Sequence, residues 1–387
     1  MPLDPYFAER LRRQRKYMIA QGLEGLKRQL GWPWFMRPAA QAGVETAPAD
    51  AAAPKRTPPR HRPAPEAAQL ETPPQATAPR VDDAHRPSRR RAEHRRITLS
   101  WDREELQKVG TPGPRVHTID RIVPVPGQPD VRLRIYYPTV GARPEGSVPG
   151  CLTFFGGAFR IGGIDYPTTD AANRRRAADA GVAMIGVDYA LAPERKYPAQ
   201  VLQGHAALDY VFAHSEELGI DPDRIGIGGM SAGANIAAAV ALMNRDRGAL
   251  PLRLQLLEVP VVDLTGRHVD FRASRALGIP SPLMARELSS VARTYLRHRR
   301  DRREPYASPI RAESLAGLPP AVILTAQYDP LRGDGVAYAA ALREAGVEAS
   351  AVQYMGATHD TAIFTGVLAV ARRWHDDVVA ALRTLHG

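Results

Sequence analysis

Short apolar runs alternate with longer amphipathic segments through the last three quarters of the chain. The runs that fit buried strands are residues 131–137, 151–155, 182–187, 224–229, 254–262, 321–326 and 349–354. Segments with helical spacing of apolar residues lie between several of them, at 198–217, 232–245, 334–345 and 361–385. Strands that alternate with helices predict an α/β domain with a mostly parallel central sheet and helices on both faces.

The first 96 residues lack this alternation. In residues 1–37, apolar side chains recur at loosely helical spacing with Arg and Lys between them, which predicts a basic amphipathic helical segment. Residues 38–96 are rich in Pro, Ala and Arg and show no apolar periodicity. Such a segment cannot bury enough apolar surface to offset the entropy of ordering, so we expect a disordered linker. The α/β domain is therefore expected over residues 97–387.

The charge of the chain is concentrated in this N-terminal part. The net charge is +11, and residues 1–100 hold 19 Lys and Arg against 10 Asp and Glu, whereas the remainder holds 33 against 31. The predicted domain is thus nearly neutral. The sequence also lacks zinc-finger spacing, an RNA-recognition signature and a basic region followed by heptads, so we expect no nucleic-acid partner.

The sequence gives a few consistent indications of the cellular compartment. Cys151 is the only cysteine, so no intrachain disulfide can form, which is typical of a reducing compartment. We expect Cys151 to pack as a small apolar residue. The N-terminus is charged where a secretory signal would be apolar, and no uncharged apolar run reaches the roughly 18 residues of a spanning helix. We expect a cytoplasmic protein, with residues 1–37 as a candidate for contact with a membrane surface.

A serine stands where one predicted strand gives way to a helix. The stretch IGIGGMSAGANI sets Ser231 among four glycines, in a G-x-S-x-G pattern. A tight strand-to-helix turn would lift the hydroxyl clear of the sheet, and glycine is needed on either side because larger side chains would collide with backbone. Ser231 is therefore the predicted nucleophile, with a plain glycine-rich turn as the alternative. A phosphate-binding P-loop is disfavoured because the stretch contains no lysine.

A serine nucleophile needs a base, and in such a fold the chain order is Ser, then Asp or Glu, then His. His359 lies in the loop directly after the last predicted strand and is the predicted base. The other histidines downstream of Ser231 are His268, His298, His375 and His386. Of these, the last three are expected at the surface.

The carboxylate that orients the base is predicted to be Asp329, which ends the strand AVILTAQY. Asp334 competes for this role but fits better as an N-cap of the following helix. Asp360 is poorly placed to face the imidazole of its own neighbour. A strand-end turn is the alternative interpretation of Asp329, since Asp-Pro is common in turns.

A hydrolytic site also needs donors for the oxyanion. The loop after the strand CLTFF contains Gly156 and Gly157, whose lack of side chains lets backbone approach a substrate. The amides of Gly157 and Ala158 are predicted donors. The amide of Ala232, at the start of the helix after the serine, is predicted to join them.

These motifs together resemble the bacterial hormone-sensitive-lipase-like family of α/β-hydrolases, over about residues 97–387. Besides the serine turn, the segment DYALAPERKYPA from Asp188 to Ala199 is similar to the Asp-Tyr-x-Leu-Ala-Pro-Glu segment of that family. The segment Asp329–Arg332 resembles its acid loop, and Met-Pro-Leu-Asp-Pro is a common start. The resemblance implies an α/β-hydrolase fold, a triad of Ser231, Asp329 and His359, and an oxyanion hole at Gly156, Gly157, Ala158 and Ala232.

The chain departs from the family pattern at several positions. The family usually has His-Gly-Gly-Gly where this chain has Phe155-Gly156-Gly157-Ala158, which keeps the backbone donors but removes a polar side chain that fixes the loop. Met230 replaces the usual acidic residue before the nucleophile. A linker, residues 38–96, separates the N-terminal segment from the domain.

The resulting prediction is a carboxylesterase or lipase-like serine hydrolase that acts on small-molecule esters and needs neither a metal nor an organic cofactor. The alternative is a hydrolase-fold protein that binds a small molecule with weak or no catalysis. For residues 1–37, a cap over the pocket is favoured over peripheral membrane contact. A second copy of the chain, forming a homodimer, is a further candidate partner.

Overall fold

Eight strands form one sheet in the computed structural model, which describes Phe7, Glu9 and residues 87–387. The strands are β1 (Thr118–Val123), β2 (Val131–Tyr136), β3 (Val148–Phe154), β4 (Ala183–Asp188), β5 (Ile220–Met230), β6 (Leu252–Glu258), β7 (Ala321–Tyr328) and β8 (Ala349–Thr358). Their order across the sheet is β1-β2-β4-β3-β5-β6-β7-β8. β2 runs antiparallel to both of its neighbours, and every pair from β4 to β8 is parallel.

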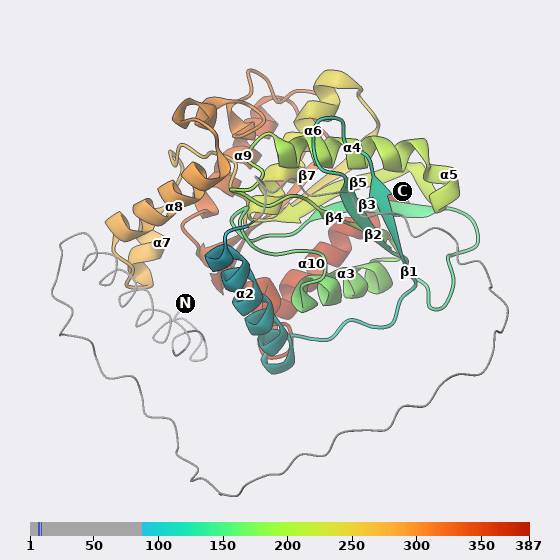
Figure 1. The fold of residues 1–387 in the computed structure, drawn as a ribbon, viewed down its shortest axis with the longest axis horizontal. Coiled ribbons are helices and arrows are strands. Elements are labelled where there is room, and N and C mark those ends of the chain that lie inside the picture. Colours follow the sequence, from blue (N-terminus) through green and yellow to red (C-terminus); the bar gives the residue numbers. More distant parts are fainter. Residues whose placement is uncertain (1–6, 8, 10–86) are drawn as a thin grey trace, which may run out of the picture. The chain divides into compact units, whose positions relative to one another are not determined.

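Helices cover both faces of this sheet (Figure 1). The α-helices are α2 (Arg89–Lys108), α3 (Pro167–Ala180), α4 (Ala199–Ala213), α5 (Ser215–Leu218), α6 (Ala232–Arg247), α7 (Phe271–Ala276), α8 (Ser281–Tyr295), α9 (Arg332–Glu344) and α10 (Ala369–Arg383). α6 and α9 pack on one face, with α4 against α6, while α3 and α10 pack on the other, with α2 against α3. The predicted mostly parallel sheet with helices on both faces is confirmed.

The two faces have separate apolar cores because side chains alternate along each strand. In β3, Leu152 and Phe154 belong to the core beneath α4, α6 and α9, whereas Cys151 belongs to the core beneath α3 and α10. Cys151 is buried, and burial raises the pKa of its thiol to about 12, so it packs as an apolar residue as expected. The same alternation places Thr153 on the α3 and α10 face.

The expected boundary between linker and domain is wrong by several residues. Residues 89–96, assigned from the sequence to the linker, form the first turns of α2. The structure explains the error, because Arg91 and Arg95 on this basic stretch pair with Glu194, whose side chain is almost fully buried. A tertiary ion pair therefore stabilises a helix that shows no apolar periodicity.

The remaining predictions for the N-terminal part, a helical segment over 1–37 and a linker from residue 38, fall almost entirely outside the described residues. Phe7 is an exception. Its ring is buried against Phe364, with the ring centroids 4.8 Å apart, in a small apolar cluster with Val109 and Leu368. No helix among the described residues is long and apolar enough to cross a membrane.

Candidate active site

Three side chains far apart in sequence meet at one edge of the sheet. Ser231 follows β5, Asp329 follows β7 and His359 follows β8. Since these strands are parallel, their carboxyl ends lie on the same edge, where open α/β sheets place their binding sites. The structure thus brings together all three residues that the sequence singled out.

Ser231 sits in a strained turn between β5 and α6. Its φ of 55° and ψ of −115° lie outside the regions that side-chain-bearing residues prefer. The turn is held by hydrogen bonds from the Ser231 amide to the Glu258 carbonyl (2.8 Å) and from the Asn235 amide to the Ser231 carbonyl (3.1 Å).

The two flanking glycines make this turn sterically feasible. A Cβ atom on Gly229 would lie 2.6 Å from the backbone of Gly233, and a Cβ atom on Gly233 would lie 2.1 Å from the carbonyl oxygen of Phe154. Contacts this short with backbone exclude any other residue without a shift of the chain. The geometry accounts for the spacing of the G-x-S-x-G pattern.

A chain of hydrogen bonds links the three side chains. In the neutral imidazole, His359 Nδ1–H donates to Asp329 Oδ2 over 2.8 Å, and Nε2 accepts from the Ser231 hydroxyl over 2.9 Å. The Leu331 amide donates to the other oxygen, Asp329 Oδ1, over 2.9 Å. Asp329 is 1% exposed, so its carboxylate is held in one orientation and shielded from solvent.

These surroundings set the basicity of the imidazole. Burial disfavours the imidazolium, but the charge of Asp329, its hydrogen bond and the charge of Asp360 outweigh burial and raise the pKa of His359 to about 9. The raised pKa means that the ring holds an added proton firmly. A proton taken from Ser231 would therefore be well accommodated on His359.

Asp334, the competing acid, lies elsewhere and is not the N-cap expected from the sequence. α9 begins at Arg332, so Asp334 lies inside its first turn. Its Oδ2 accepts from the amides of Val262 (2.9 Å) and Asp263 (3.1 Å) in the loop after β6. Burial raises the pKa of Asp334 to about 7. Its carboxyl group thus fixes a loop and does not contact the imidazole.

The loop from Phe155 to Ala158 passes beside the serine. A Cβ atom on Gly156 would lie 3.6 Å from Ser231 Cβ, and Gly157 has a φ of 131° that favours glycine. Among the described residues, the amides of Gly157 and Ala158 donate to no protein acceptor. Ala232 is the first residue of α6, whose amide has no partner within the helix. These are the amides that the sequence predicts as oxyanion donors.

Aromatic stacking holds this loop in place, although Phe155 stands where the family usually has a polar His side chain. The Phe155 ring stacks on Tyr189 with centroids 4.1 Å apart, and the Tyr189 hydroxyl donates to the Phe155 carbonyl over 2.8 Å. Phe159 stacks on Tyr295 at 3.7 Å. These contacts fix the loop although Ala158 and Phe159 have positive φ angles of 53° and 61°.

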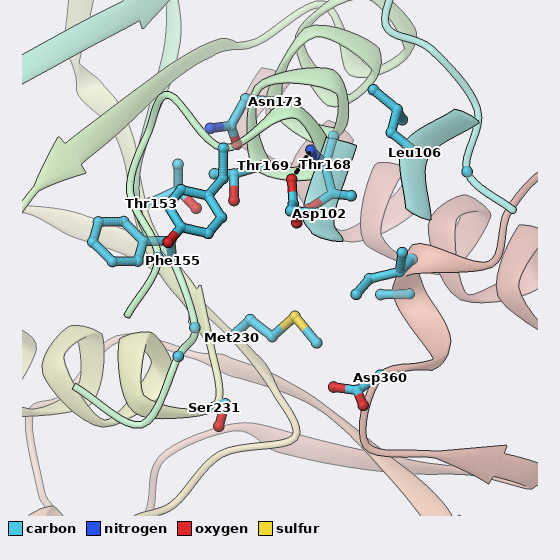
Figure 2. A pocket seen from close by; sticks show the side chains of 18 of the residues that line it. Asp102, Leu106, Thr153, Phe155, Thr168, Thr169, Asn173, Met230, Ser231 and Asp360 are labelled. Atoms are coloured by element: carbon cyan, nitrogen blue, oxygen red, sulfur yellow. Dashed lines mark hydrogen bonds between the residues drawn. The ribbon is translucent and has the colours of Figure 1, made fainter. Parts of the chain in front are cut away.

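A cavity of about 410 Å³ opens beside Ser231 (Figure 2). It extends from Ser231 and His359 past Met230 to α3, and Trp101 and Leu106 of α2 line it from the other side. This size lies within the range of small-molecule sites. α2 thus forms a wall of the site, which the sequence did not predict.

α2 is anchored around this cavity by polar contacts. Asp102 is almost fully buried and accepts from the amide and the hydroxyl of Thr168, over 2.9 and 2.6 Å, in the first turn of α3. Arg95 donates to the carbonyl oxygens of Arg160 and Ala192 as well as to Glu194. Glu194 therefore anchors a loop to α2.

The other histidines take no part in the hydrogen-bonded chain. His298 and His386 are exposed as expected. His375 is half-buried, lines the cavity and bonds Asp179 over 2.8 Å, so its assignment to the surface was wrong. No group of His, Cys, Asp and Glu able to hold a metal ion occurs among residues 87–387, Phe7 and Glu9.

Comparison with known proteins identifies the family. Residues 151–363 match the model of a family described by its alpha/beta hydrolase fold. The chain therefore belongs to this family of α/β-hydrolases, as the resemblance to its hormone-sensitive-lipase-like members indicated.

Individual relatives are named esterases. Esterase LipI of Mycobacterium tuberculosis is 35% identical over 71% of this chain and 84% of its own length. Carboxylesterase NlhH of the same organism is 34% identical over 73% of this chain and 89% of its own length. The crystal structure of EstE1, a thermostable carboxylesterase from a metagenomic library, has a TM-score of 0.69 and 34% identity over 76% of this chain and 97% of its own.

Proposed function

We propose that this chain is a serine hydrolase that cleaves carboxylic esters through an acyl-enzyme intermediate. The observation that carries the proposal is the continuous hydrogen-bonded chain from Ser231 through His359 to the buried carboxylate of Asp329, beside a cavity of about 410 Å³. The relatives named esterases support ester hydrolysis as the reaction class. No metal or organic cofactor is needed for this chemistry.

The first half-reaction forms a covalent ester. Ser231 Oγ attacks the substrate carbonyl carbon while His359 Nε2 takes the hydroxyl proton. The tetrahedral intermediate collapses, the bond to the leaving alcohol breaks, and His359 returns the proton to the alcohol oxygen. Asp329 holds the ring through Nδ1–H and stabilises the imidazolium charge in both steps.

The second half-reaction releases the acid. Water attacks the carbonyl carbon of the acyl-Ser231 ester, and His359 Nε2 takes a proton from that water. Collapse of this intermediate breaks the bond to Ser231 Oγ, which receives the proton from His359. The products are a carboxylic acid and the free enzyme.

The oxyanion in both intermediates would be bound by backbone amides. Gly157 and Ala158 supply two donors from the loop, and Ala232 supplies one at the N-terminus of α6, where the helix dipole also favours negative charge. Loss of one such donor typically costs about 10²–10³ in rate. The stacked rings of Phe155 and Tyr189 support the proposal because they hold these amides in place.

The alternative is a hydrolase-fold protein that binds a small molecule without turning it over. It is not favoured, because Ser231, His359 and Asp329 retain mutual contacts within 3 Å that a binding function does not require. The sequence departures at Phe155 and Met230 do not disrupt these contacts.

Hydrolysis of p-nitrophenyl acetate and p-nitrophenyl butyrate by wild type and Ser231→Ala tests the proposal. The wild type should turn over both esters, and Ser231→Ala should lose at least about 10⁴-fold in kcat, because the nucleophile is gone. Circular dichroism should show an unchanged fold. Equal rates for the two proteins would remove Ser231 as nucleophile, and no turnover by wild type would favour the binding protein.

A liposome test addresses residues 1–37. The burial of Phe7 against Phe364 supports a role in covering the domain over a role at a membrane. We expect the intact chain and a variant lacking residues 1–37 to sediment equally little with anionic liposomes. Binding by the intact chain alone would support membrane contact instead.

A further inference from the structure

Part of the cavity wall opposite Ser231 is polar although it lies on the sheet face that α3 and α10 cover with an apolar core. Thr153 of β3 and Thr169 and Asn173 of α3 line this part of the cavity. Figure 2 shows these three side chains grouped together, with Met230 between them and Ser231. We call Thr153, Thr169 and Asn173 the polar wall.

Strand register places the polar wall at a defined depth. Thr153 pairs with Gly186 on one side and with Gly228 on the other. A Cβ atom on Gly186 would lie 3.5 Å from Asn173 Nδ2, so the amide of Asn173 lies over Gly186, beside Thr153. Gly228 precedes Ser231 by three residues, which sets the polar wall on the order of 10 Å below the serine along the strand.

The polar groups of this wall have no hydrogen-bond partner in the described part of the chain. Asn173 is 3% exposed and Thr153 is 8% exposed, yet neither side chain forms a hydrogen bond with any described residue. The two buried asparagines of α6 behave differently: Asn235 donates to two backbone carbonyls, and Asn244 bonds Leu250. Asn173 lines the cavity and its polar atoms are not enclosed by protein, so its amide is available to a partner that enters from the cavity.

The chemistry of the polar wall defines that partner. A carboxamide and two hydroxyls offer both donors and acceptors and carry no charge. The nearby carboxyl group of Asp102 already accepts hydrogen bonds from Thr168. The guanidinium of Arg176 is paired with Glu258, so both of these charged groups already have partners within the protein. A neutral group that both donates and accepts, such as a hydroxyl, matches this arrangement.

We propose that Asn173, with Thr153 and Thr169, selects esters that carry a neutral hydrogen-bonding group on the portion lying in the cavity, remote from the scissile carbonyl. The proposal rests on the proposed ester hydrolysis and deepens it to a substrate class. A substrate with a hydroxyl at the matching depth satisfies the buried amide. An apolar analogue of the same shape leaves the amide unpaired and is rejected.

The experiment compares isosteric pairs of esters that differ in one terminal group, a hydroxyl or a methyl. One series carries the group on a medium-length acyl chain and the other carries it on the alcohol, because either portion can face the polar wall. The readout is the ratio of kcat/KM for the hydroxyl ester to that for the methyl ester. Wild type is compared with Asn173→Leu, which keeps the side-chain shape, and with Thr169→Val.

A matched control is Thr294→Val. Thr294 lies in α8, away from the cavity, and its hydroxyl bonds only the Ser290 carbonyl, so its loss should leave the ratio unchanged. In one of the two series, Asn173→Leu should lower the ratio by about tenfold, the size expected for an unpaired buried group. Thr169→Val should also lower the ratio of kcat/KM values. This second variant tests the proposal even if Asn173→Leu fails to fold.

Binding provides a readout that does not depend on turnover. In a Ser231→Ala background, Asn173→Leu should raise the ratio of Kd for the hydroxyl ester to Kd for the methyl ester, because loss of the contact weakens binding of the hydroxyl ester alone. This arm separates the two claims, since absence of hydrolysis would defeat the proposed function while the Kd ratio still tests the polar wall. Ratios unaffected by Asn173→Leu in both series and in binding would overturn the proposal. Arg175 also lines the cavity, so a preference for a terminal carboxylate that depends on Arg175 would overturn the proposal as well.

Discussion

Gly233, in the first turn of α6, packs directly against the backbone of Phe154 at the end of β3. The Cβ atom that Gly233 lacks would lie 2.1 Å from the Phe154 carbonyl oxygen and 2.5 Å from that of Phe155. Because Phe155 begins the loop with the proposed oxyanion donors, this contact fixes the nucleophile turn against that loop. One glycine therefore couples two halves of the site.

Substitution of Gly233 by alanine should be strongly destabilising. Both oxygens belong to buried backbone, so they cannot yield as a flexible side chain would, and we expect a loss of at least about 3 kcal/mol in the free energy of unfolding. Gly248, after the same helix, is the matched control because a Cβ atom there meets nothing within 4 Å. Gly248→Ala should remain within about 0.5 kcal/mol of wild type. Urea unfolding measures both, and equal midpoints for Gly233→Ala and wild type would contradict the packing described.

The two candidate acids can be separated by parallel substitutions. Asp329→Asn removes the charge that holds the His359 ring in the required tautomer, and kcat for p-nitrophenyl butyrate should fall by about 10³–10⁴-fold. Asp334→Asn removes a carboxyl group that only binds the amides of Val262 and Asp263. Since an amide oxygen can still accept from them, we expect kcat within a few-fold of wild type.

The reverse ranking of these variants would show that the acid is misassigned. Thermal unfolding of both variants serves as the control, because each replaces a buried carboxyl group. A variant that loses activity without loss of folded structure reports on chemistry, whereas one that loses both reports on stability.

The pH dependence of catalysis follows from the raised pKa of His359, about 9. The base must be neutral to take the serine proton, and below its pKa the neutral fraction falls tenfold per unit. On the acid side of the profile, kcat/KM should therefore rise by about tenfold per pH unit from pH 6 and level off only near pH 9. The rate of acid release in a pH-stat measures this, with Ser231→Ala as the control for spontaneous alkaline hydrolysis. A plateau already reached at pH 7 would show that the imidazole is less basic than its surroundings indicate.

The sequence predicted the positions of the proposed reacting groups better than the walls of the cavity around them. Ser231, Asp329 and His359 each follow a recognisable strand, and parallel strands bring such positions to one edge whatever the loops between them do. Asn173 and Thr153 carry no comparable signal, because one lies in a helix and the other in an apolar strand. Their proximity depends on how α3 packs across β4, which one-dimensional spacing does not encode.

The start of α2 shows the limit of composition as a guide. The basic stretch that begins at Arg89 has the charge and lack of periodicity typical of a linker. Its helix is stabilised by partners distant in sequence: Glu194 pairs with Arg91 and Arg95, and Thr168 bonds Asp102. Local sequence patterns carry no signal for ion pairs between residues this far apart in the chain. The sequence therefore predicts a domain that begins several residues too late.

The central claim is that Ser231 is a nucleophile activated by His359. The most direct measurement is covalent labelling with a serine-reactive fluorophosphonate, followed by mass spectrometry of the peptide that contains Ser231. We predict one phosphonyl group on Ser231 in the wild type, no label in Ser231→Ala, and labelling slowed by orders of magnitude in His359→Ala. An unlabelled wild type, a label on another residue, or labelling that is independent of His359 would contradict the account.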